Sequence, residues 1–180
     1  MEKPDYELIR AVGAGDHRAF EHLVRKYQDS LLNFVCRYLG DRDAAEDIVQ
    51  EVFLALYRTA FRFEARARAS TWLFRIAYNL SMNEIQRSQR NLKFKGTLRH
   101  LLPVDSGQSA VDGVAARERQ KDVMAALDLL PEKQRAAMLL RVNEELSYGE
   151  ISEVLSVSVS AVEALIFRAR ARLRKLLQKK

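Results

Sequence analysis

The chain has few of the residues that would support a disulfide-stapled or membrane-spanning protein. It contains one cysteine, Cys36, which excludes an internal disulfide. Cys36 sits among Leu32, Phe34 and Val35 in a helical pattern, so we expect it to fill a core. No segment approaches the roughly 18 uninterrupted apolar residues that a spanning helix needs. The first ten residues carry charges where a signal peptide needs an apolar stretch, so we expect a cytoplasmic protein.

Motifs for catalysis and metal binding are also missing from the sequence. There is no glycine-rich phosphate loop, no zinc-spaced cysteine and histidine cluster, and no His-Glu-x-x-His motif. Serines and carboxylates are plentiful, but no residue stands out as a member of a catalytic triad. We therefore expect a protein that is not an enzyme, with no catalytic residue, no metal site and no cofactor.

The composition is that of a folded protein with a basic excess. Hydrophobic residues make up 48% and charged residues 30% of 180 positions, which predicts one or two small domains. The net charge is +6, which favours a polyanionic partner such as nucleic acid. The excess lies in two zones, residues 85–104 with five Lys or Arg and residues 168–180 with seven, and neither zone contains an acid. Residues 41–51 instead hold five acids against one arginine. This pattern predicts two unlike partners.

Helical periodicity of apolar residues dominates the N-terminal half. A short helix around Leu8 is followed by a long one over residues 16–39, which Gly40 should end, and by two more. The third buries a stripe that includes Leu56 and Tyr57 and carries the acids on its polar face. The expected N-caps of the last three helices are Asp16, Asp41 and either Ser70 or Thr71. We predict that these four helices form one domain, residues 5–91.

The periodicity lapses over residues 92–114, which predicts a flexible linker. A second helical domain is expected over residues 115–178. It begins with a helix to about residue 130, and Pro131 starts the next helix at a position where proline is tolerated. Ser147 and Glu150 form a predicted capping box, and Ser158 or Ser160 should cap the last helix. No strand-like alternation occurs, so the predicted fold is all-α with two small helical domains.

The helix from residue 147 to 155, a short turn and the helix from residue 159 have the proportions of a helix-turn-helix. The last helix should bury one apolar stripe and expose a small, aromatic and basic face. Such a face suits the major groove of DNA. The alternative is a solvated C-terminal helix whose basic residues interact favourably with the helix dipole. The outward positions are expected to be Ala164, Phe167, Arg168, Ala171, Arg174 and Lys175.

Four segments together resemble a known family. They are GDHRAFEHLVRKYQDSL, DAAEDIVQEVF, STWLFRIAYN and the long C-terminal segment that begins LPEKQRAAMLL. In this order and spacing they are similar to the extracytoplasmic-function (ECF) sigma factors of bacterial RNA polymerase. The resemblance implies that the chain binds core RNA polymerase and promoter DNA to direct transcription initiation. It also implies an anti-sigma factor as a further partner, and a linker that threads toward the polymerase active-site channel.

The resemblance assigns roles in the first domain, which corresponds to sigma region 2. Its acid-rich helix would dock on the clamp helices of the largest polymerase subunit, whereas by itself that face could be an ordinary solvated one. The implied polymerase-binding residues are Asp43, Glu46, Asp47, Gln50 and Glu51. The following segment would melt the downstream promoter element and capture a flipped base, although Trp72 is equally well explained as a core residue. The implied downstream-element residues are Phe63, Arg66, Arg68, Ser70, Thr71, Trp72, Arg75 and Asn79.

The second domain corresponds to sigma region 4, which reads the upstream promoter element. The implied contacts are Ser158, Ser160, Glu163, Ala164, Phe167, Arg168, Ala171 and Arg174. The chain departs from the family pattern at Ala161, Glu163 and Ala164, where many relatives have Thr, Lys or Arg, and Ser. Ser156 also replaces the usual turn glycine. Phosphate would repel Glu163 unless its carboxylate accepts from cytosine N4 or caps the helix together with Ser160.

Two other functions fit parts of the pattern. One is a dimeric helix-turn-helix regulator whose N-terminal half binds a ligand or dimerises, and the other is a helical adaptor whose basic tail is incidental. The acid-rich segment distinguishes a sigma factor from these two alternatives. A regulator would bind duplex DNA alone, whereas a sigma factor should bind promoters usefully only together with core polymerase.

Overall fold

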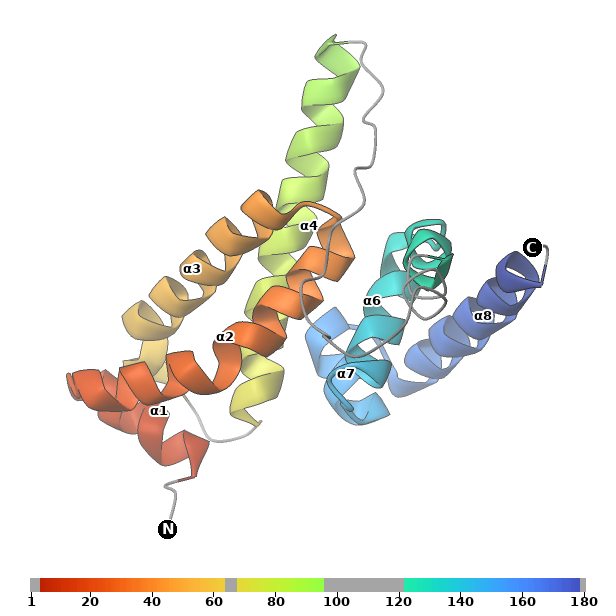
Figure 1. Cartoon of the computed structure of the whole chain (residues 1–180). Coiled ribbons are helices and arrows are strands. Elements are labelled where there is room, and N and C mark those ends of the chain that lie inside the picture. Colours follow the sequence, from red (N-terminus) through yellow and green to blue (C-terminus); the bar gives the residue numbers. More distant parts are fainter. Residues whose placement is uncertain (1–3, 64–67, 96–121, 179–180) are drawn as a thin grey trace, which may run out of the picture. The chain divides into compact units, whose positions relative to one another are not determined.

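The computed structural model describes residues 4–63, 68–95 and 122–178, and for residues 91–95 the backbone only. Every regular element within these residues is a helix, which confirms the all-α prediction (Figure 1). The chain divides into two compact units, Met1–Leu98 and Arg99–Lys180. The predicted domain limits at residues 91 and 115 stay predictions, because most of the linker expected over residues 92–114 lies outside the described residues.

The first unit consists of α1 (Asp5–Gly13), α2 (His17–Leu39), α3 (Arg42–Thr59), the short 3-10 helix η1 (Ala60–Arg62) and α4 (Ala69–Lys95). The long helix α2 is central, because it packs against α1, α3 and α4 (Figure 1). Helix α4 continues to Lys95, beyond the expected domain end. The leucine and lysines that follow Asn91 have high helix propensity, and no glycine or proline occurs before Gly96.

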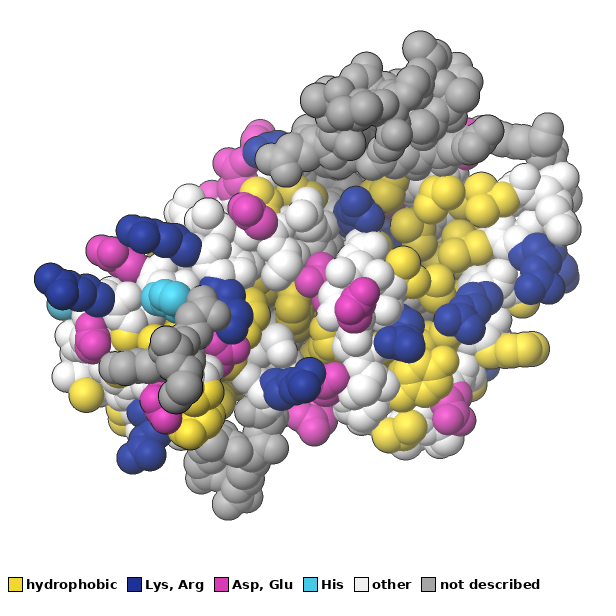
Figure 2. All heavy atoms as spheres, turned by 60° about the horizontal axis from the view of Figure 1, so that its bottom comes forward, with side chains coloured by type: hydrophobic (Ala, Val, Ile, Leu, Met, Phe, Trp, Pro, Cys, Tyr) yellow, Lys and Arg dark blue, Asp and Glu magenta, His cyan; other side chains and the backbone are white. Residues whose placement is uncertain are grey.

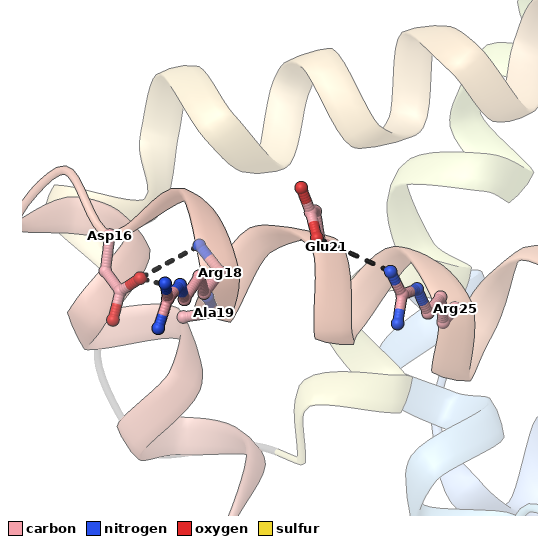
Figure 3. A network of polar contacts seen from close by, with 5 residues as sticks. All are labelled: Asp16, Arg18, Ala19, Glu21 and Arg25. Atoms are coloured by element: carbon pink, nitrogen blue, oxygen red, sulfur yellow. Dashed lines mark hydrogen bonds and ion pairs between the residues drawn. The ribbon is translucent and has the colours of Figure 1, made fainter.

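Local hydrogen bonds fix both ends of α2 as predicted. The Asp16 carboxylate accepts hydrogen bonds from the backbone N–H groups of Arg18 and Ala19 at 2.9 and 3.2 Å (Figure 3). At the other end Gly40 has φ 70°, a left-handed conformation that glycine adopts without steric cost, and its N–H donates to the Cys36 carbonyl. The first backbone N–H groups and the last carbonyl groups of a helix would otherwise lack partners inside it.

The next two helices start differently from each other. Asp41 caps α3 as expected, because its carboxylate accepts from the Ala44 N–H at 3.1 Å. The prediction that Ser70 or Thr71 caps α4 is wrong. The helix begins at Ala69, and the Trp72 N–H already donates to the Arg68 carbonyl at 3.1 Å. Ser70 and Thr71 therefore lie in the first helical turn rather than before it.

Aromatic packing forms the centre of the first unit. The Phe34 ring stacks on Tyr38 with centroids 5.8 Å apart and meets the Phe74 ring edge-on at 5.5 Å, which joins α2 to α4. Edge-on pairs of this kind are among the arrangements that aromatic rings prefer. Cys36 is buried as expected, and burial raises the pKa of its thiol.

Helix α1 buries Leu8, Ile9 and Val12, and contacts at both of its ends add to this packing. The Asp5 carboxylate pairs with the Lys26 ammonium at 2.7 Å and accepts a hydrogen bond from the Tyr27 hydroxyl at 2.5 Å. Burial, reinforced by this hydrogen bond, raises the pKa of Tyr27 well above its usual range. At the other end of α1, a Cβ atom on Gly13 would come within 2.9 Å of the Phe61 backbone nitrogen, so glycine allows α1 to approach η1 closely.

The described part of the second unit contains a helical segment at 122–128, then α6 (Glu132–Val142), α7 (Tyr148–Leu155) and α8 (Val159–Leu177). The first part of the helix expected over residues 115–130 lies outside the described residues. Helix α8 packs against both α6 and α7. An ion pair between Asp128 and Arg135 at 3.2 Å joins the 122–128 segment to α6. Burial raises the pKa of Asp128 in spite of that arginine.

Capping side chains define the α7–turn–α8 unit. The predicted capping box is present, with the Glu150 N–H donating to Ser147 Oγ at 3.3 Å and the Ser147 N–H donating to Glu150 Oε2 at 2.8 Å. Of the two caps considered for α8, Ser158 is the correct one, because its Oγ accepts from the Ala161 N–H at 3.2 Å. Ser156 ends α7 in a left-handed conformation with φ 52° and ψ 51°.

The left-handed Ser156 predicts a stabilising substitution. A residue with a Cβ pays roughly 1 to 2 kcal/mol for this conformation, whereas glycine does not. Ser156 is exposed, so Ser156→Gly loses no buried contact. We expect it to raise the free energy of unfolding of the second unit by about 1 kcal/mol, measured by urea denaturation of the whole chain followed by circular dichroism.

A matched control separates this conformational effect from the chemistry of the substitution. Ser160→Gly places the same change inside α8 and should destabilise the unit by about 0.5 kcal/mol. Trp72 is the one tryptophan of the chain and lies in the first unit, so its fluorescence transition should not move in either variant. Equal effects of the two variants would contradict the assignment of strain to Ser156.

Candidate functional surfaces

An acidic surface lies along one side of α3. Five polar side chains are exposed there, and the apolar side chains on the opposite side of the helix are buried. The helix is therefore amphipathic. We call this set the α3 acidic face, and it consists of Asp43, Glu46, Asp47, Gln50 and Glu51. Glu46 pairs with Arg42 at 2.9 Å, an exposed pair of the kind that contributes little to stability. The face is therefore available to a partner at small cost.

Apolar side chains extend this surface toward the end of α3. Leu54 and Tyr57 are each 43% exposed, and Phe61 in η1 is 65% exposed. The expectation that Tyr57 belongs to the buried stripe is wrong, because its ring lies at the edge of the core. It packs edge-on against Phe20 at 5.5 Å and stacks on His17 at 6.1 Å. Leu54 follows Glu51 by three positions, so the helical period could have identified it as exposed.

The segment before α4 brings two aromatic rings together. The Phe63 and Trp72 ring centroids are 5.2 Å apart with an angle of 50° between the rings, and both residues are half-buried. Trp72 is therefore neither a fully buried core residue nor a freely exposed one. The contact joins the two positions that flank residues 64–67. Residues 64–67, which include the candidate Arg66, lie outside the described residues.

The remaining downstream-element candidates divide between surface and interior. Arg68, Arg75 and Asn79 are exposed, and Ser70 is half-buried. Thr71 is only 2% exposed, and its Oγ1 has no hydrogen-bond partner within the described residues. Arg75 and Asn79 are four positions apart, so α4 presents them on one side, and Arg68 precedes the helix.

Helix α8 has the orientation that its sequence predicted. Its inner stripe, including Val162, Ile166 and Ala169, is buried. Phe167 is 75% exposed, the largest exposed fraction among the large hydrophobic side chains of the described residues. Figure 2 shows Lys and Arg side chains beside exposed hydrophobic side chains on the right-hand part of the surface, which the C-terminal unit forms. We call the exposed side the α8 outer face, and it consists of Ser160, Glu163, Phe167, Arg168, Ala171, Arg174 and Lys175, with Ala164 half-buried at its side.

Glu163 does not cap α8. A capping box places the acidic residue three positions after the N-cap, and with Ser158 as the cap that position is Ala161. Ser160 instead shares a hydrogen bond with Ser158, with the two Oγ atoms 3.0 Å apart. This removes one of the two explanations that the sequence left open for Glu163.

No group of three or more His, Cys, Asp or Glu side chains among the described residues could hold a metal ion. None of the helices in this part of the chain combines the length and the apolar character that crossing a membrane requires.

Comparison with known proteins identifies the family. Models of sigma-70 region 2 and sigma-70 region 4 match residues 23–91 and 120–173. The ECF RNA polymerase sigma factor SigW of Bacillus subtilis is 32% identical over 99% of both chains. The chain belongs to the ECF sigma factors. It thus directs promoter-specific initiation of transcription, and its relatives are initiation factors rather than catalysts.

Further similarities agree with this assignment. The RNA polymerase sigma-H factor of Pseudomonas aeruginosa is 33% identical over 98% of this chain and 95% of its own. Among solved structures, that of CnrH in complex with the cytosolic domain of CnrY matches with a TM-score of 0.74 and 28% identity, covering 99% of each chain. The region 2 match includes α3 and most of α4, and the region 4 match includes α6, α7 and most of α8. The three candidate surfaces of this sigma factor therefore lie inside the matched regions, apart from Arg174 and Lys175, which follow the end of the region 4 match.

Proposed function

We propose that this sigma factor joins core RNA polymerase to promoter DNA through three separate surfaces. The α3 acidic face binds polymerase, the exposed side of α4 with the segment before it binds the downstream element, and the α8 outer face binds the upstream element. The sharp separation of acids on α3 from bases on α8 is the observation that carries this proposal. The protein itself catalyses no reaction, and it acts in the cytoplasm, where bacterial polymerase transcribes.

The α3 acidic face suits a positively charged partner. Its side chains are exposed and are held on a helix whose other side is buried. Within the described residues, the one ion pair on this face joins Glu46 to Arg42. Charge complementarity of this kind mainly sets orientation and association rate. The exposed Leu54 and Tyr57 at its end add apolar area, which favours a lasting contact.

Charge reversal tests the docking surface. The double variant Asp47→Lys and Glu51→Lys should keep the fold, because both residues are exposed, and should weaken binding to core polymerase about tenfold or more. Fluorescence anisotropy with labelled protein measures the affinity. The matched control, Glu21→Lys with Asp29→Lys, makes the same charge change on exposed positions of α2 and should bind normally. Normal affinity of the α3 variant would contradict the assignment.

The downstream surface combines cations with an aromatic pair. Arg68 and Arg75 are exposed and suit phosphates, while the Phe63–Trp72 pair offers ring surface on which an unstacked base could rest. Each stacked base contributes about 1 to 3 kcal/mol in single-strand binding. Thr71 is buried, so we propose that it supports the start of α4 rather than touching DNA.

The upstream surface presents a protruding ring that is followed by cations. In a helix-turn-helix the second helix enters the major groove and its N-terminal residues reach the base edges. Phe167 projects from the N-terminal half of α8 and suits the methyl group of thymine. Arg168 and Arg174 follow Phe167 along the helix, are both exposed, and suit phosphate or guanine.

Removing these two arginines should change the salt dependence of DNA binding. Each lost phosphate contact lowers the slope of log affinity against log salt by about 0.9, so Arg168→Ala with Arg174→Ala should lower it by nearly two. The slope is measured for the complex with core polymerase on promoter DNA. Arg18→Ala with Arg25→Ala, on α2, is the control and should leave the slope unchanged. An unchanged slope in the α8 variant would remove these arginines from the interface.

The two units act together through their linker. Binding of one unit raises the effective concentration of the other at its own element, so neither needs high affinity alone. Deletion of residues 115–180 should therefore abolish run-off transcription from duplex promoters while circular dichroism still shows a helical protein. A truncated chain that transcribed as well as the whole chain would contradict the bipartite mechanism.

We also propose an anti-sigma factor as a partner. The similar structure of CnrH is a complex with the cytosolic domain of CnrY, which supports a protein partner for this chain as well. Such a factor would block initiation by covering the α3 acidic face, the DNA-binding surfaces, or both.

A further inference from the structure

Glu163 is an isolated acid on a basic surface. It is the single acidic residue in α8, which carries four arginines and one lysine. Its side chain is exposed, and within the described residues it has no ion pair or hydrogen bond. An ionised carboxylate only accepts hydrogen bonds, so in a dry interface it needs a donor.

Three glutamates on other helices of this chain have an arginine one turn away as a partner. Glu21 pairs with Arg25 at 3.5 Å (Figure 3), and Glu46 and Glu84 pair with Arg42 and Arg87. The positions one turn from Glu163 are instead uncharged. They are Val159, Ser160, Ile166 and Phe167. The cations of α8 begin at Arg168, beyond the reach of this spacing.

The position of Glu163 on α8 places it among residues that approach bases. It is the fifth residue of the helix, one turn before Phe167, and the first half of a recognition helix is the part that enters the major groove. Phosphates would repel the carboxylate at that place. Of the base edges in the major groove, cytosine N4 and adenine N6 offer donors. The adenine donor lies beside the N7 acceptor, which would repel a carboxylate, so cytosine suits Glu163 better.

We infer that Glu163 selects a cytosine in the upstream promoter element. The inference rests on the proposed function, because it requires that the α8 outer face binds the upstream element. Capping is excluded as the reason for an acid here, and no cation of the described residues neutralises it, so a base donor is the partner that compensates its burial against DNA.

The spacing along α8 also limits where this cytosine lies. Phe167 follows Glu163 by four positions, which is about 6 Å along the helix axis at 1.5 Å per residue. Base pairs are stacked about 3.4 Å apart. The cytosine that Glu163 contacts should therefore lie within about two base pairs of a thymine that Phe167 contacts.

Selection from a promoter library tests this inference. The whole protein with core polymerase transcribes templates in which the upstream element is randomised, and the transcribed templates are sequenced. The natural chain should show about a tenfold preference for cytosine at one position, beside a preference for thymine. Glu163→Ala, a change that favours helix, should lose the cytosine preference and keep the preferences at other positions.

Glu153→Ala is the matched control, since it removes an equally exposed acid from α7 of the same unit. It should change no base preference, even if removing an acid raises transcription from all templates. If the natural chain shows no cytosine preference, or if the preference persists in Glu163→Ala, the inference is wrong while the proposed function stands. If no upstream sequence is enriched at all, both the inference and the upstream part of the proposed function are wrong.

Discussion

Burial of one apolar stripe on each of α3 and α8 determines which side chains these helices present to a partner. On α3 the buried residues include Ile48, Val52 and Leu56, and on α8 they include Val162 and Ile166. Each such side chain contributes about 1.5 to 3 kcal/mol when it leaves water. Turning either helix about its axis would expose several of them at once. The rotation of the helices is thus fixed by the core, and the acids and bases are held outward without further contacts.

This constraint explains how a small protein can hold surfaces of opposite charge. The acids lie on a helix of the first unit and the densest group of arginines lies on the last helix of the second, so each surface is formed within its own unit. In the proposed function, polymerase and DNA each meet the side that matches their charge. Modest affinity at each surface is sufficient, because binding at one surface raises the effective concentration at the others.

Features that depend on a few neighbouring residues were predictable from the sequence. The Asp16 and Asp41 caps, the Ser147 and Glu150 capping box and the outward direction of Phe167 follow from local spacing. Features that depend on the rest of the fold were not. The start of α4 depends on the chain before it, the exposure of Tyr57 depends on packing against Phe20 and His17, and the Phe63–Trp72 contact joins positions on two sides of a loop. The family pattern implies the proposed roles of the surfaces, and the structure shows which of their residues are accessible.

The central claim is that the acidic and basic surfaces work together only when polymerase is bound. The most direct test is an electrophoretic mobility shift of duplex promoter DNA with the purified chain, in the presence and absence of core enzyme. The account predicts a specific complex with core enzyme and none with the chain alone at the same concentration. A specific complex with the chain alone, unchanged by core enzyme, would instead indicate an independent DNA-binding regulator and contradict the account.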